Sequence, residues 1–408
     1  MAILKVRREN SLTGRGYLIV AAMTIVVLST LTVLLAIIVD PYRMYGVAPI
    51  RGLTEQKPAA YRNSYFVKDY MLDRMKPHTL LLGNSRVEVG LDPNSPLWPD
   101  RDRPVFNAAE AGFDLATATR KLRNALEIAP LRLAVVAVDF PDFLAPFDLA
   151  APGDANSENG CPLADRGGRL GAQPTIQRWR DRIITTLTID ALWDSILTIA
   201  DQNPASSVTM TDAGFNPLHQ YAEAARREGY NALFAQKQAD YIAQYSAYPK
   251  TDFRVPMRHA NFRCLDQIVR MTISRRVPLV IFINPYHYTL LELWHEDGLW
   301  PTFEAWKRAL VAVVDHAAGN DRWLVTVLDF SGYSRFAMEA IPPPDDRHTA
   351  MHWYWESGHY TSALGQQLIA RIVGKDDHFG QELSAVTIDQ VLRNIADARP
   401  GATAALSQ

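Results

Sequence analysis

The longest apolar segment of the chain covers residues 17–39, which contain no charged side chain and no proline. A helix of about 20 apolar residues crosses the roughly 30 Å hydrocarbon core of a bilayer and satisfies its own backbone hydrogen bonds there. Asp40 follows the segment, and four basic residues precede it: Lys5, Arg7, Arg8 and Arg15. This asymmetry predicts a cytoplasmic N-terminus, residues 1–16, with the rest of the chain across the membrane.

A cleavable signal peptide is the alternative interpretation of the same segment. Its apolar core is usually about 7 to 15 residues long and is followed by a small-x-small cleavage site. Here the apolar run is longer and ends in IIVDPY, residues 37–42, which lacks such a site. We therefore expect an uncleaved single-pass anchor in a bacterial-type inner membrane, with the main domain in the periplasm or outside the cell.

Beyond the anchor, short apolar runs alternate with helical patterns. The runs cover residues 78–82, 104–106, 133–138, 278–283 and 323–328, and each stops at a glycine, asparagine or aspartate. Such runs are typical of strands that are buried on both faces. Helical periodicity lies between them, at residues 113–128, 261–274 and 303–316. The alternation predicts an α/β domain whose parallel sheet has five strands and carries helices on both faces.

Further segments flank this predicted sheet domain, which extends over residues 76–375. Residues 40–75 are mixed in polarity and form a connector that contains one predicted helix, at residues 65–75. Residues 376–408 are expected to form a C-terminal helix and a frayed tail.

A long interval at about residues 143–258 interrupts the alternation. Residues 150–174 are rich in Gly, Pro, Asp and Asn, a composition typical of loops. Two helical patterns follow, at residues 175–200 and 217–247. We interpret the interval as a helical insertion that could cover the carboxyl edge of the sheet.

Composition and charge narrow the class of protein. A hydrophobic content of 48% and a charged content of 21% are those of a folded globular protein. The net charge of −2 argues against a nucleic-acid partner, which usually requires a basic face. The two cysteines, Cys161 and Cys264, either form a disulfide in an oxidising compartment or remain isolated thiols.

Polar residues follow the predicted strands, at the edge where ligands bind in open α/β sheets. Ser85 lies just beyond the first run, and Gly83 permits a sharp turn before it. Glu356 and His359 are three residues apart, so the carboxylate can contact the imidazole. A serine becomes nucleophilic when a histidine accepts its proton and a carboxylate orients that histidine. We therefore predict a triad of Ser85, His359 and Glu356.

Residues near this triad have two interpretations each. The backbone N–H groups of Ser85 and Gly112 are candidate donors to an oxyanion, although Ser85 is also explained as a helix N-cap. Arg86 either pairs with a structural carboxylate or binds an anionic substrate. His287, beyond the fourth run, either lines the pocket or is a half-buried structural residue.

Three blocks of the sequence resemble the SGNH (GDSL-like) hydrolase superfamily. Residues 83–86, GNSR, with GLDP at 90–93, resemble its nucleophile block. Residues 107–112 resemble the second block, which supplies an oxyanion glycine, and residues 356–359 resemble the last block, Asp-x-x-His. The resemblance implies a flavodoxin-like fold and acyl transfer or ester hydrolysis through Ser85, with no cofactor and no metal.

The chain departs from the family pattern at two places. Glu356 stands where the family has Asp, and the third block, Gly-x-Asn-Asp, is replaced by VDFPD at residues 138–142. Asn107 and Asn284 are the candidates for the missing asparagine donor. The anchor is similar to that of members related to the alginate acetylation and teichoic acid D-alanylation proteins. The resemblance therefore implies acyl chemistry, with acetyl expected, on a cell-surface polysaccharide beside a membrane-bound acyltransferase.

Two other function classes remain open. If residues 348–359 were helical, His348, His352, Glu356 and His359 would share one face and could bind zinc in a hydrolase. Ser357-Gly358 and the prolines at 342–344 argue against such a helix. The domain could also keep the fold as a non-catalytic accessory protein that binds a polysaccharide or a protein partner.

Overall fold

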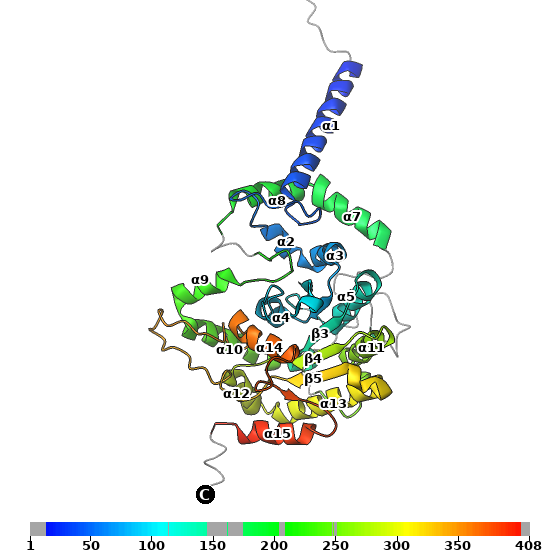
Figure 1. Cartoon of the computed structure of the whole chain (residues 1–408). Coiled ribbons are helices and arrows are strands. Elements are labelled where there is room, and N and C mark those ends of the chain that lie inside the picture. The colour runs from blue at the N-terminus through cyan, green and yellow to red at the C-terminus, as the bar shows by residue number, and fades with distance from the viewer. Residues whose placement is uncertain are drawn as a thin grey trace, which may run out of the picture.

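The computed structural model describes residues 14–112, 114–144, 161, 174–203, 209–246, 248 and 251–400. Helix α1, Gly14–Val39, projects from a globular body (Figure 1). It is long and apolar enough to cross a membrane, and most of its side chains are exposed. Much of the predicted cytoplasmic segment, residues 1–13, lies outside the described residues, as do the loop-like residues 150–174 apart from Cys161 and Pro174, and the tail from residue 401.

A six-stranded sheet in the order β2-β1-β3-β4-β5-β6 forms the centre of the body. Its strands are β1 Thr79–Leu82, β2 Val105–Asn107, β3 Leu133–Val138, β4 Leu279–Ile283, β5 Val325–Asp329 and β6 Gln381–Glu382. The first five pair in parallel, as the apolar runs predict. The prediction of five strands is incomplete, because β6 adds an antiparallel edge strand to β5. With two half-exposed or exposed residues, β6 carries no apolar run.

The larger helices match the helical patterns of the sequence. They are α3 Ser64–Met75, α5 Leu115–Ile128, α11 Ala260–Ser274, α13 Trp300–Ala318 and α15 Ile388–Asp397. Shorter elements are α2 Pro58–Arg62, α4 Ser85–Gly90, α6 Phe140–Leu144, α12 Tyr288–Glu296, α14 Ser362–Ile372 and the 3₁₀ helices η1 Asp100–Asp102, η2 Pro256–Arg258 and η3 Gly319–Leu324. The start of the fifth strand was predicted too early: Trp323 is exposed and belongs to η3.

Each helical pattern of the insertion divides into two helices. The first gives α7 Pro174–Leu187 and α8 Ile189–Ala200, separated at Thr188, whose hydroxyl accepts from the N–H of Ala191 and caps α8. The second gives α9 His219–Glu228 and α10 Tyr230–Ser246. They separate at Gly229, whose φ of +87° is unfavourable for residues with a Cβ atom.

Alternate strand residues divide the core into two clusters, one on each face of the sheet. Leu80 and Leu82 belong to the cluster that contains α5, α11 and α13, whereas Leu81 belongs to the cluster that contains α4 and α14. β3 and β4 alternate in the same way. The sheet is therefore buried on both faces, and only its edges and strand ends can carry a site.

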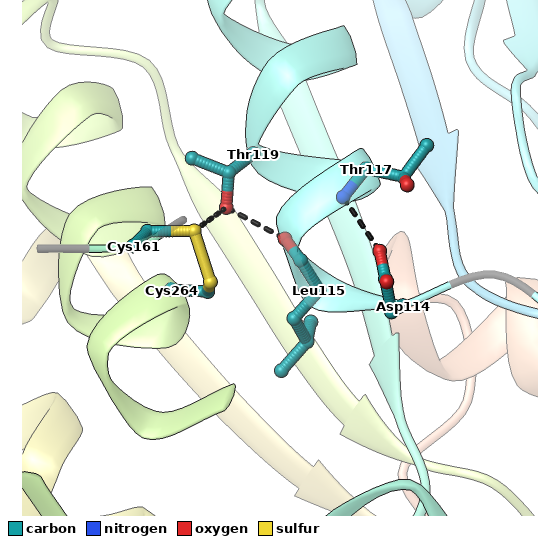
Figure 2. The surroundings of a disulfide bond; sticks show 6 residues. All are labelled: Asp114, Leu115, Thr117, Thr119, Cys161 and Cys264. Atoms are coloured by element: carbon teal, nitrogen blue, oxygen red, sulfur yellow. Dashed lines mark hydrogen bonds between the residues drawn. A yellow bond between two sulfur atoms is a disulfide. The ribbon is translucent and has the colours of Figure 1, made fainter. Parts of the chain in front are cut away.

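A disulfide joins Cys161 to Cys264, with a Cα–Cα distance of 4.4 Å (Figure 2). This confirms the paired alternative for the two cysteines. Cys264 lies on α11, and Thr119 Oγ1 on the neighbouring α5 is 3.6 Å from Cys161 Sγ. Asp114 accepts from the N–H of Thr117 at the start of α5. The bond thus attaches part of the insertion to the helical layer that contains α5 and α11.

Candidate active site

Ser85 is placed by a tight turn between β1 and α4. Asn84 caps α4, because its Oδ1 accepts a hydrogen bond of 3.1 Å from the N–H of Arg86. A Cβ atom at Gly83 would lie 2.6 Å from Val87 Cγ2, so only glycine allows α4 to pack this close to the turn. Ser85 itself is half-buried at the first position of α4, beyond the carboxyl end of β1.

His359 lies in a small hairpin over residues 353–361. The N–H of Trp355 donates to the carbonyl of His359 at 2.9 Å, and the N–H of Thr361 donates to the carbonyl of Trp353 at the same distance. The carboxylate of Glu339 accepts the backbone N–H groups of three residues at the start of the hairpin: His352, Trp353 and Tyr354. The tight turn of this hairpin, residues 356–358, brings the Glu356 side chain next to the imidazole.

The structure brings the three predicted triad residues together. Ser85 Oγ is 2.7 Å from His359 Nε2, and His359 Nδ1 hydrogen-bonds to Glu356 Oε1. The contact to the carboxylate places the proton on Nδ1, so Nε2 is free to accept the proton of the serine hydroxyl. The Glu356 side chain therefore reaches the histidine.

The carboxylate of Glu356 is fully buried and stays ionised. Burial raises its pKa, but the electrostatic interaction with His359 and hydrogen bonds from His359 and from the N–H of Gly358, 2.8 Å away, outweigh burial and bring the pKa to about 2. The carboxylate is thus available at neutral pH to orient His359 and to stabilise its imidazolium form.

Asp139 forms a buried hub behind the triad. Its carboxylate accepts a hydrogen bond from Arg86 Nη1 at 3.0 Å, from Asn284 Nδ2 at 3.1 Å and from the Tyr286 hydroxyl at 2.5 Å. Asn84 Nδ2 donates to the same carboxylate. The hub links the ends of β1, β3 and β4 next to Ser85.

Arg86 pairs with a buried carboxylate, which is one of the two interpretations that its sequence position allows. Its guanidinium is buried, pairs with Asp139, and donates through Nε to the carbonyl of Gly358 at 2.8 Å and through Nη2 to the hydroxyl of Tyr241 at 3.1 Å. Burial lowers its pKa, but Asp139 outweighs burial and raises it, so the cation is permanent. Arg86 therefore connects the serine turn to the histidine hairpin.

Asn107, a candidate oxyanion donor, directs its side-chain amide to backbone carbonyls. Both of its amide hydrogens are used, because Nδ2 donates to the carbonyl of Val87 at 2.8 Å and to that of Leu91 at 3.0 Å. Asn284 is also fully buried and directs Nδ2 to Asp139, while its Oδ1 accepts from the hydroxyl of Tyr360. Both asparagines therefore position backbone and side chains around the site.

Gly112 is exposed and has a φ of +69°, in the segment that follows β2. The start of this segment is attached to the serine turn, because the N–H of Glu110 donates to the carbonyl of Gly83 at 3.2 Å. The backbone N–H of Gly112 thus remains the second candidate oxyanion donor, beside that of Ser85.

His287 does not line a pocket, because it is fully buried. Its Nε2 is 2.8 Å from the carbonyl oxygen of Glu339, and burial lowers its pKa to about 4, which keeps the ring neutral. Its backbone N–H donates to the carbonyl of Ser357 at 3.1 Å. His287 thus supports the hairpin that carries His359.

Sequence reasoning missed three residues that support the site: Tyr241, Tyr286 and Glu339. Tyr286 follows β4 by three positions, so its place at a strand end was a usable signal. Tyr241 lies in the middle of α10, and no local pattern distinguishes it from other buried aromatic residues. Its contact with Arg86 shows that one helix of the insertion lies beside the site.

The structure lacks the helix that the zinc hypothesis requires at residues 348–359. Residues 348–359 are not helical, and Glu356 is bonded to His359. Across the described ranges, the only cluster of three or more possible ligands with neighbouring donor atoms is Asp376, Asp377 and His378, outside the predicted set.

No protein-family model matches this chain, and no curated protein matches it.

Proposed function

We propose that the chain is a membrane-anchored serine esterase or O-acyltransferase of the SGNH hydrolase type. Its substrates would be acyl groups, with acetyl expected, on a cell-surface polysaccharide. The observation that carries the proposal is the chain of contacts from Ser85 through His359 to the buried, ionised Glu356. A nucleophile, a base and an orienting carboxylate in hydrogen-bond reach are the parts that acyl transfer needs.

In the proposed mechanism, Ser85 Oγ attacks the acyl carbonyl while His359 Nε2 accepts the hydroxyl proton. The N–H groups of Ser85 and Gly112 stabilise the tetrahedral oxyanion. His359 then returns the proton to the leaving alcohol, and an acyl-Ser85 ester remains. Water or a sugar hydroxyl attacks this ester, with His359 again as base. Esterase and transferase share the acyl-enzyme and differ in the acceptor.

The sheet order supports the SGNH-like assignment. The five parallel strands have the order 2-1-3-4-5, which is the flavodoxin-like order. Ser85, Asp139 and Asn284 follow β1, β3 and β4, at the carboxyl edge where ligands bind in such sheets.

The location that we propose is the periplasmic side of a bacterial inner membrane. The basic N-terminus and the apolar α1 support this orientation, and the disulfide fits an oxidising compartment. A membrane-bound acyltransferase is the proposed partner that would supply acyl groups. No nucleic-acid partner is expected.

A non-catalytic polysaccharide- or partner-binding role is the second candidate. One observation favours it: both asparagines considered as side-chain oxyanion donors are directed to other acceptors. Binding without turnover would then survive loss of the Ser85 hydroxyl.

Covalent labelling of the full chain by a fluorophosphonate tests the proposal. We expect labelling at Ser85, loss of labelling in Ser85→Ala, and retention in the matched control Ser362→Ala, because Ser362 is an exposed serine three residues from His359. Folded wild-type protein that neither reacts with the reagent nor hydrolyses a p-nitrophenyl ester, yet binds polysaccharide, would favour the binding role.

A further inference from the structure

Helices α7 and α8 lie at the junction between α1 and the globular body (Figure 1). They meet at Thr188, and their axes bend by 61°. Both pack against α1 and against each other. The pair therefore adjoins the end of the apolar helix from which the body begins.

The distribution of polar and apolar side chains on this pair is inverted relative to a water-exposed helix. Most of the exposed residues of the pair are large and apolar: Trp179, Ile183, Ile184, Leu187, Ile189, Trp193, Ile196 and Ile199. The other exposed residues are Arg178, Arg180, Arg182, Asp190 and Ala200. The inward residues are mostly polar: Asp181, Thr185, Thr186, Asp194, Ser195 and Thr198. A surface helix in water shows the opposite arrangement, so the outward face is suited to an apolar surrounding.

The inward polar groups have specific partners, which fixes the orientation of the pair. The hydroxyl of Tyr42 donates to Asp194 at 2.5 Å, and the hydroxyl of Tyr70 donates to Asp181 at 3.2 Å. Gln202, just beyond α8, accepts the backbone N–H groups of Glu55 and Gln56. Rotating either helix to bury its apolar face would break these bonds and leave the acceptors unsatisfied.

Charge and aromatic content favour lipid as the occupant. Trp179 and Trp193 are exposed on the outward face, and tryptophan is enriched where a bilayer meets water. Arg180 and Arg182 are exposed on α7 and can extend toward anionic headgroups, whereas Arg178 pairs with Asp73. Both helices pack against α1, and exposed apolar residues, such as Leu34 and Ile38, lie near the end of that helix.

We infer that the outward face of α7 and α8 inserts into the leaflet in which α1 ends. The two helices lie in the interfacial plane with their apolar side chains among the acyl chains and their polar face against the connector. The body is thereby held to the membrane by three helices, and its orientation relative to the bilayer is restricted. This inference is independent of the activity proposed for Ser85.

Depth-dependent quenching in nanodiscs tests the inference on the full chain. Ile183→Cys and Ile196→Cys each carry an environment-sensitive fluorophore, and Val386→Cys, 90% exposed in the C-terminal region, is the matched control. The native cysteines are paired, so each variant has one reactive thiol. In phosphatidylethanolamine–phosphatidylglycerol nanodiscs with brominated acyl chains, labels at 183 and 196 should lose most of their fluorescence, and the label at 386 should lose none.

Aqueous iodide should give the reverse order of quenching. Each labelled variant must retain the disulfide and the wild-type melting temperature. The inference is overturned if labels at 183 and 196 are as accessible to iodide as the label at 386. It is also overturned if they are accessible in lipid nanodiscs but shielded in native membranes, because a protein partner would then cover the face. Failure of the full chain to enter nanodiscs would overturn it as well.

Discussion

The triad surroundings and the α7–α8 pair both depart from the rule that apolar groups lie inside and polar groups outside. Around Ser85, charged side chains are buried: Arg86, Asp139 and Glu356. On α7 and α8, polar side chains are buried and large apolar side chains are exposed. Buried charges are tolerated when each has partners, whereas exposed apolar surface is tolerated when the surrounding medium is apolar. The same kind of departure thus accompanies the proposed reactive serine in one region and the proposed contact with lipid in the other.

The largest effect is expected at the nucleophile. Ser85→Ala should lower kcat for a p-nitrophenyl ester by roughly 10³-fold or more, and His359→Ala nearly as much, because the two act as one unit. Steady-state kinetics of the full chain measures this, with Ser362→Ala as control. Folded Ser85→Ala protein with wild-type turnover would contradict the proposal that Ser85 is the nucleophile.

The buried ion pair behind the site gives the second effect. Arg86→Met leaves Asp139 buried without its cation and should destabilise the fold by about 3–5 kcal/mol. Arg270→Met is the matched control, because Arg270 pairs with Asp266 on the exposed surface of α11, where such a pair contributes about 1 kcal/mol or less. Equal losses in the two variants, measured by denaturant unfolding, would contradict the role given to the hub.

The disulfide gives the third effect. It closes a loop with a sequence separation of 103, so Cys264→Ala should cost about 2–5 kcal/mol of stability. The double variant Cys161→Ala/Cys264→Ala should lose a similar amount, since either change opens the same bond. Urea titrations compare the three proteins. A wild-type midpoint in both variants would show that the pair does not constrain the chain.

The fourth prediction concerns pH and Glu356. Its pKa falls from an ordinary 4.5 to about 2 on folding, so its ionised form stabilises the native state above 4.5, and this contribution disappears as the pH falls through about 2. The stability difference between wild type and Glu356→Gln should therefore shrink steadily over that interval. Urea melts at several pH values measure it, and a constant difference would argue against an ionised Glu356.

The smallest effect is expected on the outward face of α7. Ile183→Ser should change the stability of the detergent-solubilised chain by no more than about 0.5 kcal/mol, because this exposed side chain buries little protein surface. A loss of several kcal/mol in detergent would place Ile183 in the protein core and would abolish the contrast between the two regions.

Local sequence patterns predicted the strands that are buried along nearly their whole length. The apolar runs located β1 to β5, since strands covered on both faces need apolar residues at every position. The contacts among Ser85, His359 and Glu356 could be predicted, because Ser85 follows a strand end and Glu356 and His359 are three residues apart. The partners of Asn107, the carbonyls of Val87 and Leu91, could not be predicted, because the packing of α4 brings them close.

Other features depend on contacts between segments far apart in the chain. Tyr241 supports Arg86 across 155 positions, and no local pattern shows such a contact. The inverted polarity of α7 and α8 was also missed, because an amphipathic sequence does not indicate which face turns inward. The partners Tyr42 and Tyr70 decide that question, and they lie in the connector.

The contact between Ser85 and His359 also has a consequence for biosynthesis. It joins residues 274 positions apart, and Arg86 reaches the carbonyl of Gly358 over 272. During synthesis the serine turn therefore emerges long before the hairpin, and a chain shortened before the hairpin keeps Ser85 without the imidazole that contacts it. Reactivity at Ser85 would then report that the domain has been translated and folded through its last third.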